Sequence, residues 1–190
     1  MVTDRGPRKA VLLADFLKSD QNRTVNLPQD SRIGISAKAI QSSLESAAVT
    51  PVRQACGEFL SALAGFYKVE TPNTLVLSAR PIRTREGGWA TEIFGDYDPE
   101  TKLIRVWMRT AVRNHVTSFG TFLSTLCHEF CHHLDFQLFR YADSWHTRGF
   151  YERTAALYHN ARGTPAKRLF WIKMPGGRWR IDWPRTNRGF

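Results

Sequence analysis

Apolar positions along the chain repeat with the periods of regular secondary structure, and they predict a helical first part followed by a mixed second part. Helical spacing predicts three helices, at residues 8–19, 36–48 and 50–67. Thr50 and Pro51 have the chemistry of an N-cap and a first helical residue for the third helix. The apolar face of that helix is expected to lie in the core and consists of Val52, Cys56, Phe59, Leu60 and Leu63.

Three strands are predicted after the helical part. Residues 74–79 and 89–97 are rich in β-branched and aromatic side chains, and residues 102–108 alternate apolar and basic ones. The intervening residues 98–101, Asp-Pro-Glu-Thr, have the composition of a hairpin turn. The last strand leads directly into the next helix, so the chain is expected to have an α+β fold with a small antiparallel or mixed sheet.

The strongest helical pattern of the chain follows this sheet. Ser118 is an expected N-cap, and neither proline nor glycine interrupts residues 121–148. A second helix is predicted at about residues 145–161, where Gly163 and Pro165 end it. The apolar stripe of the first of these two helices is formed by Phe119, Phe122, Leu123, Leu126, Phe130, Leu134 and Leu138.

The pattern indicates one domain with an extension. Residues 1–166 are expected to form the domain, with helices in residues 1–72 and the sheet and two further helices in residues 73–166. Residues 167–190 are expected to form a basic, aromatic extension with two strands joined by a Pro-Gly-Gly turn. Their arginines alternate with Phe170, Trp171, Trp179 and Trp183, a composition suited to single-stranded nucleic acid or to a hairpin whose aromatic side chains pack inward.

Composition places the chain among ordinary globular proteins. Apolar residues make up 42%, no apolar run reaches the length of a membrane span, and the first 20 residues resemble an amphipathic helix more than a signal peptide. The three cysteines provide no disulfide framework and are expected to be buried thiols. We therefore expect a cytoplasmic protein without a transmembrane segment.

Charge is distributed unevenly. Residues 1–100 hold 12 basic and 12 acidic side chains, whereas residues 101–190 hold 15 basic and 5 acidic ones and so supply the whole net charge of +10. A basic half can attract nucleic acid, an anionic membrane or acidic substrates. Any nucleic-acid binding is expected to reside in residues 160–190, which carry eight basic side chains.

The candidate chemistry lies in the helix after the sheet, as His128-Glu129-Phe130-Cys131-His132. Residues four apart on a helix lie about 40° apart around its axis, so His128 and His132 can present two imidazoles to one point. Zinc binds neutral imidazole, and a catalytic zinc keeps one position open for water. Glu129, beside the first ligand, could take a proton from that water.

Downstream, His146 opens the next predicted helix and Phe150 follows four residues later. Together with the H-E-x-x-H motif, this arrangement resembles the SprT-like (Spartan-type) zincin metalloproteases and related small bacterial H-E-x-x-H metallopeptidases. The resemblance covers residues 117–153, about a fifth of the chain. It implies a zincin-like fold, one Zn²⁺ held by His128, His132 and His146, Glu129 as general base, and hydrolysis of peptide bonds in a protein or peptide substrate.

The resemblance also has limits. SprT-like proteins often carry a C-terminal zinc ribbon of paired cysteines, but no cysteine follows Cys131, so dependence on DNA does not carry over. In the resembling folds an edge strand before the active-site helix binds extended substrate, which here would be residues 102–108. The alternative functions are a nucleic-acid-associated protein with a structural or catalytically lapsed metal site and a metal hydrolase acting on something other than peptides.

Other residues have roles that the sequence leaves open. Glu152 competes with His146 as third ligand, and the sequence favours His146 because Asp143 or Ser144 can cap the helix and place His146 in its first turn. Asp135 could orient a ligand histidine or make polar contacts at the helix surface. His115 and His159 are expected to be surface or structural residues. The candidates for stabilising a developing oxyanion are Tyr151, Arg148 and His133.

Overall fold

A computed structural model describes residues 1–29, 31–84 and 90–189, and the contacts within it divide the chain into two compact units. One is continuous and comprises residues 28–133; we call it the central unit. The other combines residues 1–27 with residues 134–190; we call it the discontinuous unit. The sequence division at residue 166 stays a prediction.

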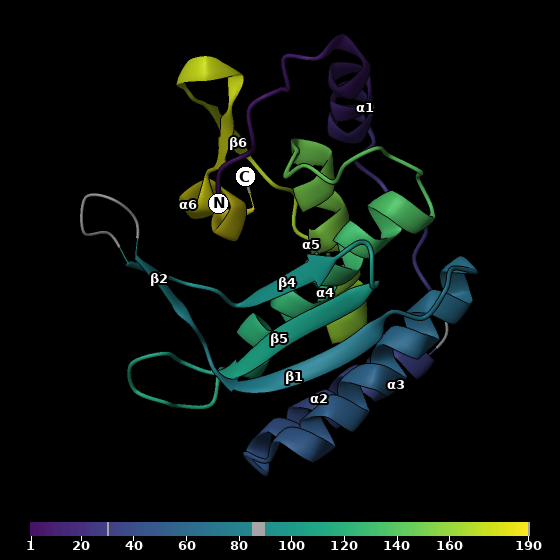
Figure 1. The fold of residues 1–190 in the computed structure, drawn as a ribbon, viewed down its shortest axis with the longest axis vertical. Coiled ribbons are helices and arrows are strands. Elements are labelled where there is room, and N and C mark those ends of the chain that lie inside the picture. Colours follow the sequence, from purple (N-terminus) through teal and green to yellow (C-terminus); the bar gives the residue numbers. More distant parts are fainter. Residues whose placement is uncertain (30, 85–89, 190) are drawn as a thin grey trace. The chain divides into compact units, whose positions relative to one another are not determined.

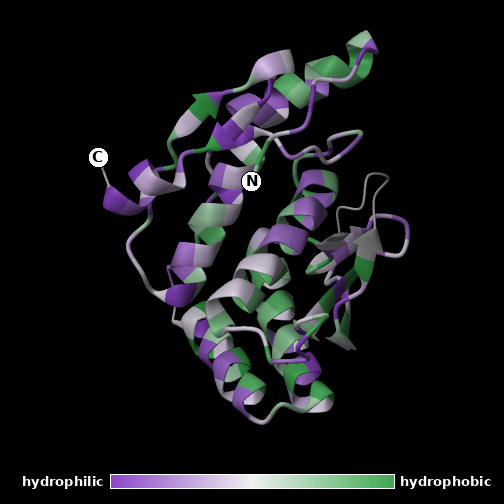
Figure 2. Ribbon diagram, turned by 90° about the vertical axis from the view of Figure 1, so that its left-hand side faces the viewer, coloured by the Kyte–Doolittle hydropathy of each residue, from purple (hydrophilic) through white to green (hydrophobic). Residues whose placement is uncertain are grey.

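The central unit begins with two helices, α2 (Arg32–Glu45) and α3 (Val49–Tyr67), which pack against each other. The predicted apolar face of α3 is confirmed as core, since all five of its side chains are at most 1% exposed. Figure 2 shows that the helices carry both apolar and polar residues, as expected of helices that bury one face.

The boundaries of these two helices differ from the sequence prediction. α3 begins at Val49 with Ala48 as its N-cap, so Thr50 is not the cap. Pro51 fits in the first turn because the amide groups there have no partner within the helix. α2 lies earlier than predicted and ends at Glu45, since Ala47 adopts a left-handed φ of 54° that breaks the helix.

A three-stranded mixed sheet follows, with the order β1 (Asn73–Ala79), β5 (Leu103–Arg109) and β4 (Gly95–Asp98). β5 runs parallel to β1 and antiparallel to β4, and Figure 1 shows it in the middle of the three. The predicted alternation is confirmed, because Ile104, Val106 and Met108 are fully buried while their neighbours in β5 are not. The α+β class and the small mixed sheet are therefore confirmed.

Two predictions for the sheet are wrong. Residues 102–108 were expected to form an edge strand, but β5 has a partner on both sides and the edge strand beside it is β4. Residues 89–97 were expected to form one strand, but they contain β3 (Ala90–Glu92), which pairs with β2 (Ile82–Thr84), and the separate β4. Trp89, the first residue of that prediction, lies outside the described residues. The hairpin turn at residues 98–101 is confirmed, since Asp98 pairs with Leu103.

The helix with the histidine motif is α4 (Phe119–Gln137). Ser118 caps it as predicted, because its Oγ accepts a hydrogen bond from the Thr121 amide at 3.4 Å. The predicted apolar stripe is buried at Phe122, Leu123, Leu126, Phe130 and Leu134, each at most 1% exposed, but Leu138 lies beyond the end of α4 and is 37% exposed. The stripe thus fixes which face of α4 remains for the histidines.

The discontinuous unit contains α1 (Ala10–Gln21), α5 (Arg148–Arg162), the hairpin of β6 (Trp171–Lys173) and β7 (Trp179–Ile181), a 3₁₀ turn at Pro175–Gly177, and α6 (Trp183–Arg188). The predicted C-terminal hairpin is confirmed, with Trp171 opposite Ile181. α1 lies two residues later than predicted. None of the helices in the described residues has the length and apolar character that a membrane span needs.

The N-terminal segment joins the hairpin of this unit. The Thr3 amide donates to the Trp179 carbonyl at 2.8 Å, and the Trp179 amide donates to the Thr3 hydroxyl at 2.8 Å. Val2 forms an antiparallel bridge with Arg180, and the Ile181 amide donates to the Met1 carbonyl at 3.2 Å. Residues 1–3 therefore pair with β7 through these hydrogen bonds and the isolated bridge at Val2.

α1 and α5 approach each other closely at Gly149. A Cβ atom built on Gly149 would lie 2.0 Å from the Ser19 carbonyl oxygen and 2.6 Å from that of Asn22. Both oxygens belong to backbone, which cannot rotate away, so only glycine fits this contact. Ser19 is fully buried there, and its hydroxyl lies 2.9 Å from that of Thr147.

We expect Gly149→Ala to lower the free energy of unfolding by about 1–3 kcal/mol, because it forces the two helices apart. Urea unfolding followed by circular dichroism measures the change. Gly65→Ala is the matched control, since a Cβ there meets nothing within 4 Å and Gly65 is exposed in α3. Equal stability of the Gly149 variant and the control would contradict the close approach.

Candidate metal centre

His128 and His132 lie on one face of α4, as their spacing predicts. Their Nε2 atoms are 3.3 Å apart, and their ring centroids are 4.9 Å apart at an interplanar angle of 80°. Both side chains are half-buried, so solvent and small ions can reach them. Two imidazoles that meet through their Nε2 atoms can hold one cation between them.

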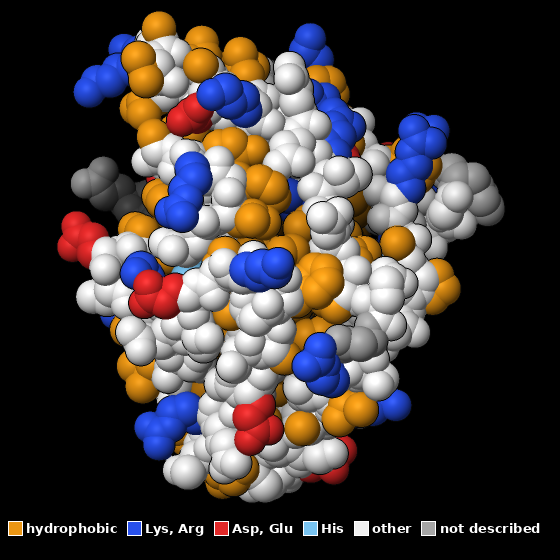
Figure 3. Space-filling view, turned by 90° about the vertical axis from the view of Figure 1, so that its right-hand side faces the viewer, with side chains coloured by type: hydrophobic (Ala, Val, Ile, Leu, Met, Phe, Trp, Pro, Cys, Tyr) orange, Lys and Arg blue, Asp and Glu red, His pale blue; other side chains and the backbone are white. Residues whose placement is uncertain are grey.

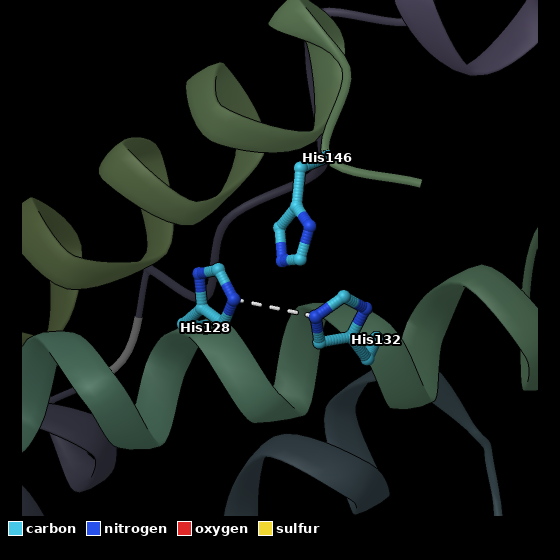
Figure 4. A group of neighbouring side chains, drawn as sticks. All are labelled: His128, His132 and His146. Atoms are coloured by element: carbon cyan, nitrogen blue, oxygen red, sulfur yellow. Dashed lines mark hydrogen bonds between the residues drawn. The ribbon is translucent and has the colours of Figure 1, made fainter. Parts of the chain in front are cut away.

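His146 completes a group of three histidines. Each offers one ring nitrogen, and these atoms all lie within 4.8 Å of one another, so the group could hold a metal ion (Figure 4). A set of three neutral imidazoles suits a borderline-soft divalent ion such as zinc and leaves a tetrahedral position open. The donor set therefore fits the metal that the sequence predicted.

The local position of His146 differs from the prediction. α5 begins at Arg148, and its N-cap is Thr147, whose Oγ1 accepts from the Phe150 amide at 3.0 Å. Neither Asp143 nor Ser144 caps the helix, and His146 precedes it instead of lying in its first turn. The prediction missed that Thr147 can cap while the residue before a cap stays extended.

Three side chains of the discontinuous unit fix the ring of His146. Its Nδ1 lies 3.3 Å from Asp4 Oδ2. Its ring stacks on that of Tyr151 with a centroid distance of 5.8 Å, and the Phe150 ring meets it edge-on with a centroid distance of 5.2 Å. Burial would raise the pKa of Asp4, but the hydrogen bonds from His146 outweigh it and lower that pKa. Phe150, four residues after His146 in the sequence, thus packs against its ring, whereas no signal in the sequence pointed to Asp4.

Glu129 is 5% exposed, so it lies beneath the surface beside His128. Burial raises the pKa of Glu129 to about 8, and the negative charge of Asp96 adds to the effect. Asp96 itself accepts two hydrogen bonds from Arg105, at 2.6 and 3.0 Å. A divalent cation bound by the neighbouring histidines would lower the pKa of Glu129, because its positive charge favours the ionised carboxylate.

The edge strand β4 lies directly against Glu129. A Cβ atom on Gly95 would lie 2.8 Å from Glu129 Oε1, 3.0 Å from Glu129 Cγ and 2.7 Å from Thr125 Cγ2. An isolated glycine within a strand often marks such an approach, so the sequence held a signal for Gly95 that the strand prediction did not use. Because Gly95 has no side chain, the Glu129 carboxylate can occupy the space beside it.

We expect Gly95→Ala to push the Glu129 side chain out of position and to lower any activity that needs this carboxylate by 10-fold or more. Zinc content should stay near that of the unmodified protein, because the three atoms nearest to the added Cβ belong to Thr125 and Glu129. Gly57→Ala is the control, since a Cβ there meets nothing within 4 Å. Full activity in the Gly95 variant would show that the position of Glu129 does not matter.

Asp135 lies in a buried polar cluster and not at the helix surface, and its role in orienting a ligand histidine stays a prediction. It is fully buried and accepts hydrogen bonds from Arg153 Nη2 at 2.6 Å and from Ser144 Oγ at 2.8 Å. Arg153 is also fully buried and donates to the Ser19 carbonyl at 3.2 Å. Asp135 therefore ties the segment before His146 to α5 through a buried ion pair.

The predicted oxyanion candidates are mostly engaged elsewhere. His133 uses both ring nitrogens, with Tyr97 Oη at 3.0 Å and the Glu70 carbonyl at 2.8 Å. Arg148 pairs with Asp20, where both carboxylate oxygens lie 3.1 Å from its Nε. Tyr151 stacks on His146, a member of the histidine group, and its hydroxyl donates to the Val2 carbonyl at 3.3 Å.

Glu152, the competing third ligand, is not part of the histidine group among the described residues. Its Oε1 accepts from the Trp171 indole at 2.9 Å and lies 3.4 Å from Arg23. His115 is exposed, and the half-exposed His159 lies 2.8 Å from the Thr164 hydroxyl, in line with the surface roles expected for both. Cys56, Cys127 and Cys131 are buried and form no disulfide, as predicted.

Comparisons of the chain with protein-family models, with curated proteins and with solved structures found no match. The resemblance to the SprT-like zincins therefore rests on the motif residues alone.

Proposed function

We propose that the chain is a zinc-dependent metallopeptidase of zincin type. The observation that carries this proposal is the three-histidine group with a buried carboxylate, Glu129, next to its first member. A purely structural site would need four protein ligands and no neighbouring base, whereas three histidines leave a position for water.

When bound, zinc would polarise the scissile carbonyl and activate a water molecule. His128, His132 and His146 would hold the ion. Glu129 would accept the proton of the attacking water and later deliver it to the leaving amine. Its burial beneath Gly95 keeps the carboxylate in one position, so that little motion is needed before the proton transfer.

The substrate would lie along β4, which is the edge of the three-stranded sheet next to Glu129. An extended peptide can add to a sheet edge through main-chain hydrogen bonds. This role replaces the one first expected for residues 102–108, which form the middle strand. A protein or peptide in extended conformation is therefore the substrate class that we propose.

The test measures the zinc content of the purified protein and the cleavage of an unfolded protein such as reduced casein. We expect about one zinc per chain and proteolysis that a chelator removes and added zinc restores. Zinc without hydrolysis would favour a structural or lapsed site, and hydrolysis of a non-peptide ester alone would favour a different metal hydrolase.

The nucleic-acid alternative depends on the basic residues near the C-terminus. Arg180, Arg185 and Arg188 are exposed, while Arg168 and Arg185 lie over the Phe170 ring. Figure 3 shows Lys and Arg side chains spread among apolar ones over one face of the molecule instead of gathered in one continuous patch. Binding of nucleic acid thus stays a prediction, and the metallopeptidase reading is the one that we favour.

A further inference from the structure

His146 is held by a carboxylate that is far from it in sequence. Asp4 and His146 are 142 residues apart, yet they share three contacts. The His146 amide donates to Asp4 Oδ2 at 2.9 Å, the Asp4 amide donates to the His146 carbonyl at 3.0 Å, and His146 Nδ1 lies 3.3 Å from Asp4 Oδ2. One carboxylate oxygen therefore fixes both the backbone and the ring of this histidine.

The contact selects one form of the imidazole. A carboxylate oxygen can only accept, so in the neutral imidazole Nδ1 carries the proton and Nε2 keeps its lone pair. Only the nitrogen with the lone pair can bind a metal ion. A hydrogen bond from the other ring nitrogen to a carboxylate also makes the imidazole a better donor and stops its rotation.

Asp4 is itself held in place. The adjacent Thr3 is 4% exposed and exchanges two hydrogen bonds with Trp179 of β7, both at 2.8 Å. Val2 accepts from the hydroxyl of Tyr151, whose ring stacks on His146. The pairing of residues 1–3 with β7 thus holds Asp4 next to His146.

We propose that Asp4 is the positioning residue of the third metal ligand: it holds His146 as the Nδ1–H tautomer and directs Nε2 to the ion. The C-terminal hairpin acts through Asp4, so residues 171–181 have a part in metal affinity without contacting the metal. This inference rests on the proposed function, because it requires that His146 bind the ion.

The test compares the zinc affinity of Asp4→Asn with that of the unmodified full chain, by competition with a chromogenic chelator. Asparagine can still accept the His146 amide but supplies no negative charge to the ring. We expect zinc affinity to fall about 10- to 100-fold and the visible spectrum of the Co²⁺-loaded protein to shift, with unfolding of the metal-free protein unchanged. The matched control is Asp182→Asn, whose carboxylate also accepts one backbone amide, that of Arg185, and should bind zinc normally.

A second measurement needs no variant. In the zinc-loaded protein, ¹⁵N NMR of His146 should show a protonated Nδ1 and a metal-bound Nε2. Zinc bound through Nδ1, or an Asp4→Asn protein with unchanged affinity and Co²⁺ spectrum, would overturn the role of Asp4 while leaving the metallopeptidase proposal standing. Failure of the unmodified protein to bind zinc would instead remove both proposals.

Discussion

Replacing Glu129 by glutamine is expected to abolish hydrolysis while leaving zinc in place. Glutamine has the shape of glutamate, so it fits the space beneath Gly95, but it cannot accept the proton of the attacking water. Loss of a general base costs typically 10²- to 10⁴-fold in rate. The measurement is kcat/KM on an unfolded protein substrate together with the zinc content of the same sample.

The control for this variant is Glu70→Gln. Glu70 is an exposed carboxylate of the same unit, where it pairs with Lys102 at the surface. Its replacement removes the same charge from the chain at a position outside the histidine group. Equal activity of the two variants would remove the proposed mechanism, whereas loss of zinc from the Glu129 variant would mean that the carboxylate acts as a ligand.

The second large effect is expected at His146. His146→Ala removes one of three ligands, so the protein should lose most of its zinc during dialysis against a mild chelator and become inactive. Glu152→Ala should keep its zinc, because Glu152 bonds to Trp171 and Arg23 and lies outside the group. Zinc stoichiometry by mass spectrometry separates the two candidates.

His159→Ala serves as the control for a lost imidazole. It belongs to α5, as Glu152 does, and its ring lies against the Thr164 hydroxyl. Zinc content should therefore match that of the unmodified protein. Retention of zinc in the His146 variant with loss in the Glu152 variant would reverse the assignment and make glutamate the third ligand.

The sequence predicted the helices and the motif face well because periodicity is a local property. The stripe of α4 and the 0% exposure of alternate residues in β5 follow directly from spacing. Helix ends were less accurate, since several side chains compete to cap. Thr147 and Ser144 are both good caps in isolation, and the hydrogen bond from Ser144 to Asp135 decides between them.

Long-range contacts could not be predicted. β1 pairs in parallel with β5 although β2, β3 and β4 lie between them in the sequence. Nothing in the alternation of residues 102–108 distinguishes a middle strand from an edge strand. Asp4 has no local pattern that relates it to His146, because its role arises from pairing of Thr3 with Trp179. The motif thus predicts the two histidines of one helix, and the fold supplies what holds the third.

The discontinuous unit also constrains the order in which the chain can mature during synthesis. Thr3 and Trp179 are 176 residues apart, so their pairing must await synthesis of the second hairpin strand, whereas residues 28–133 have all their internal partners much earlier. Closing so long a loop is slow compared with forming contacts between neighbours. If Asp4 positions His146, a nascent chain that has not yet exposed Trp179 lacks the full-affinity site, so zinc loading at full affinity follows synthesis of the hairpin.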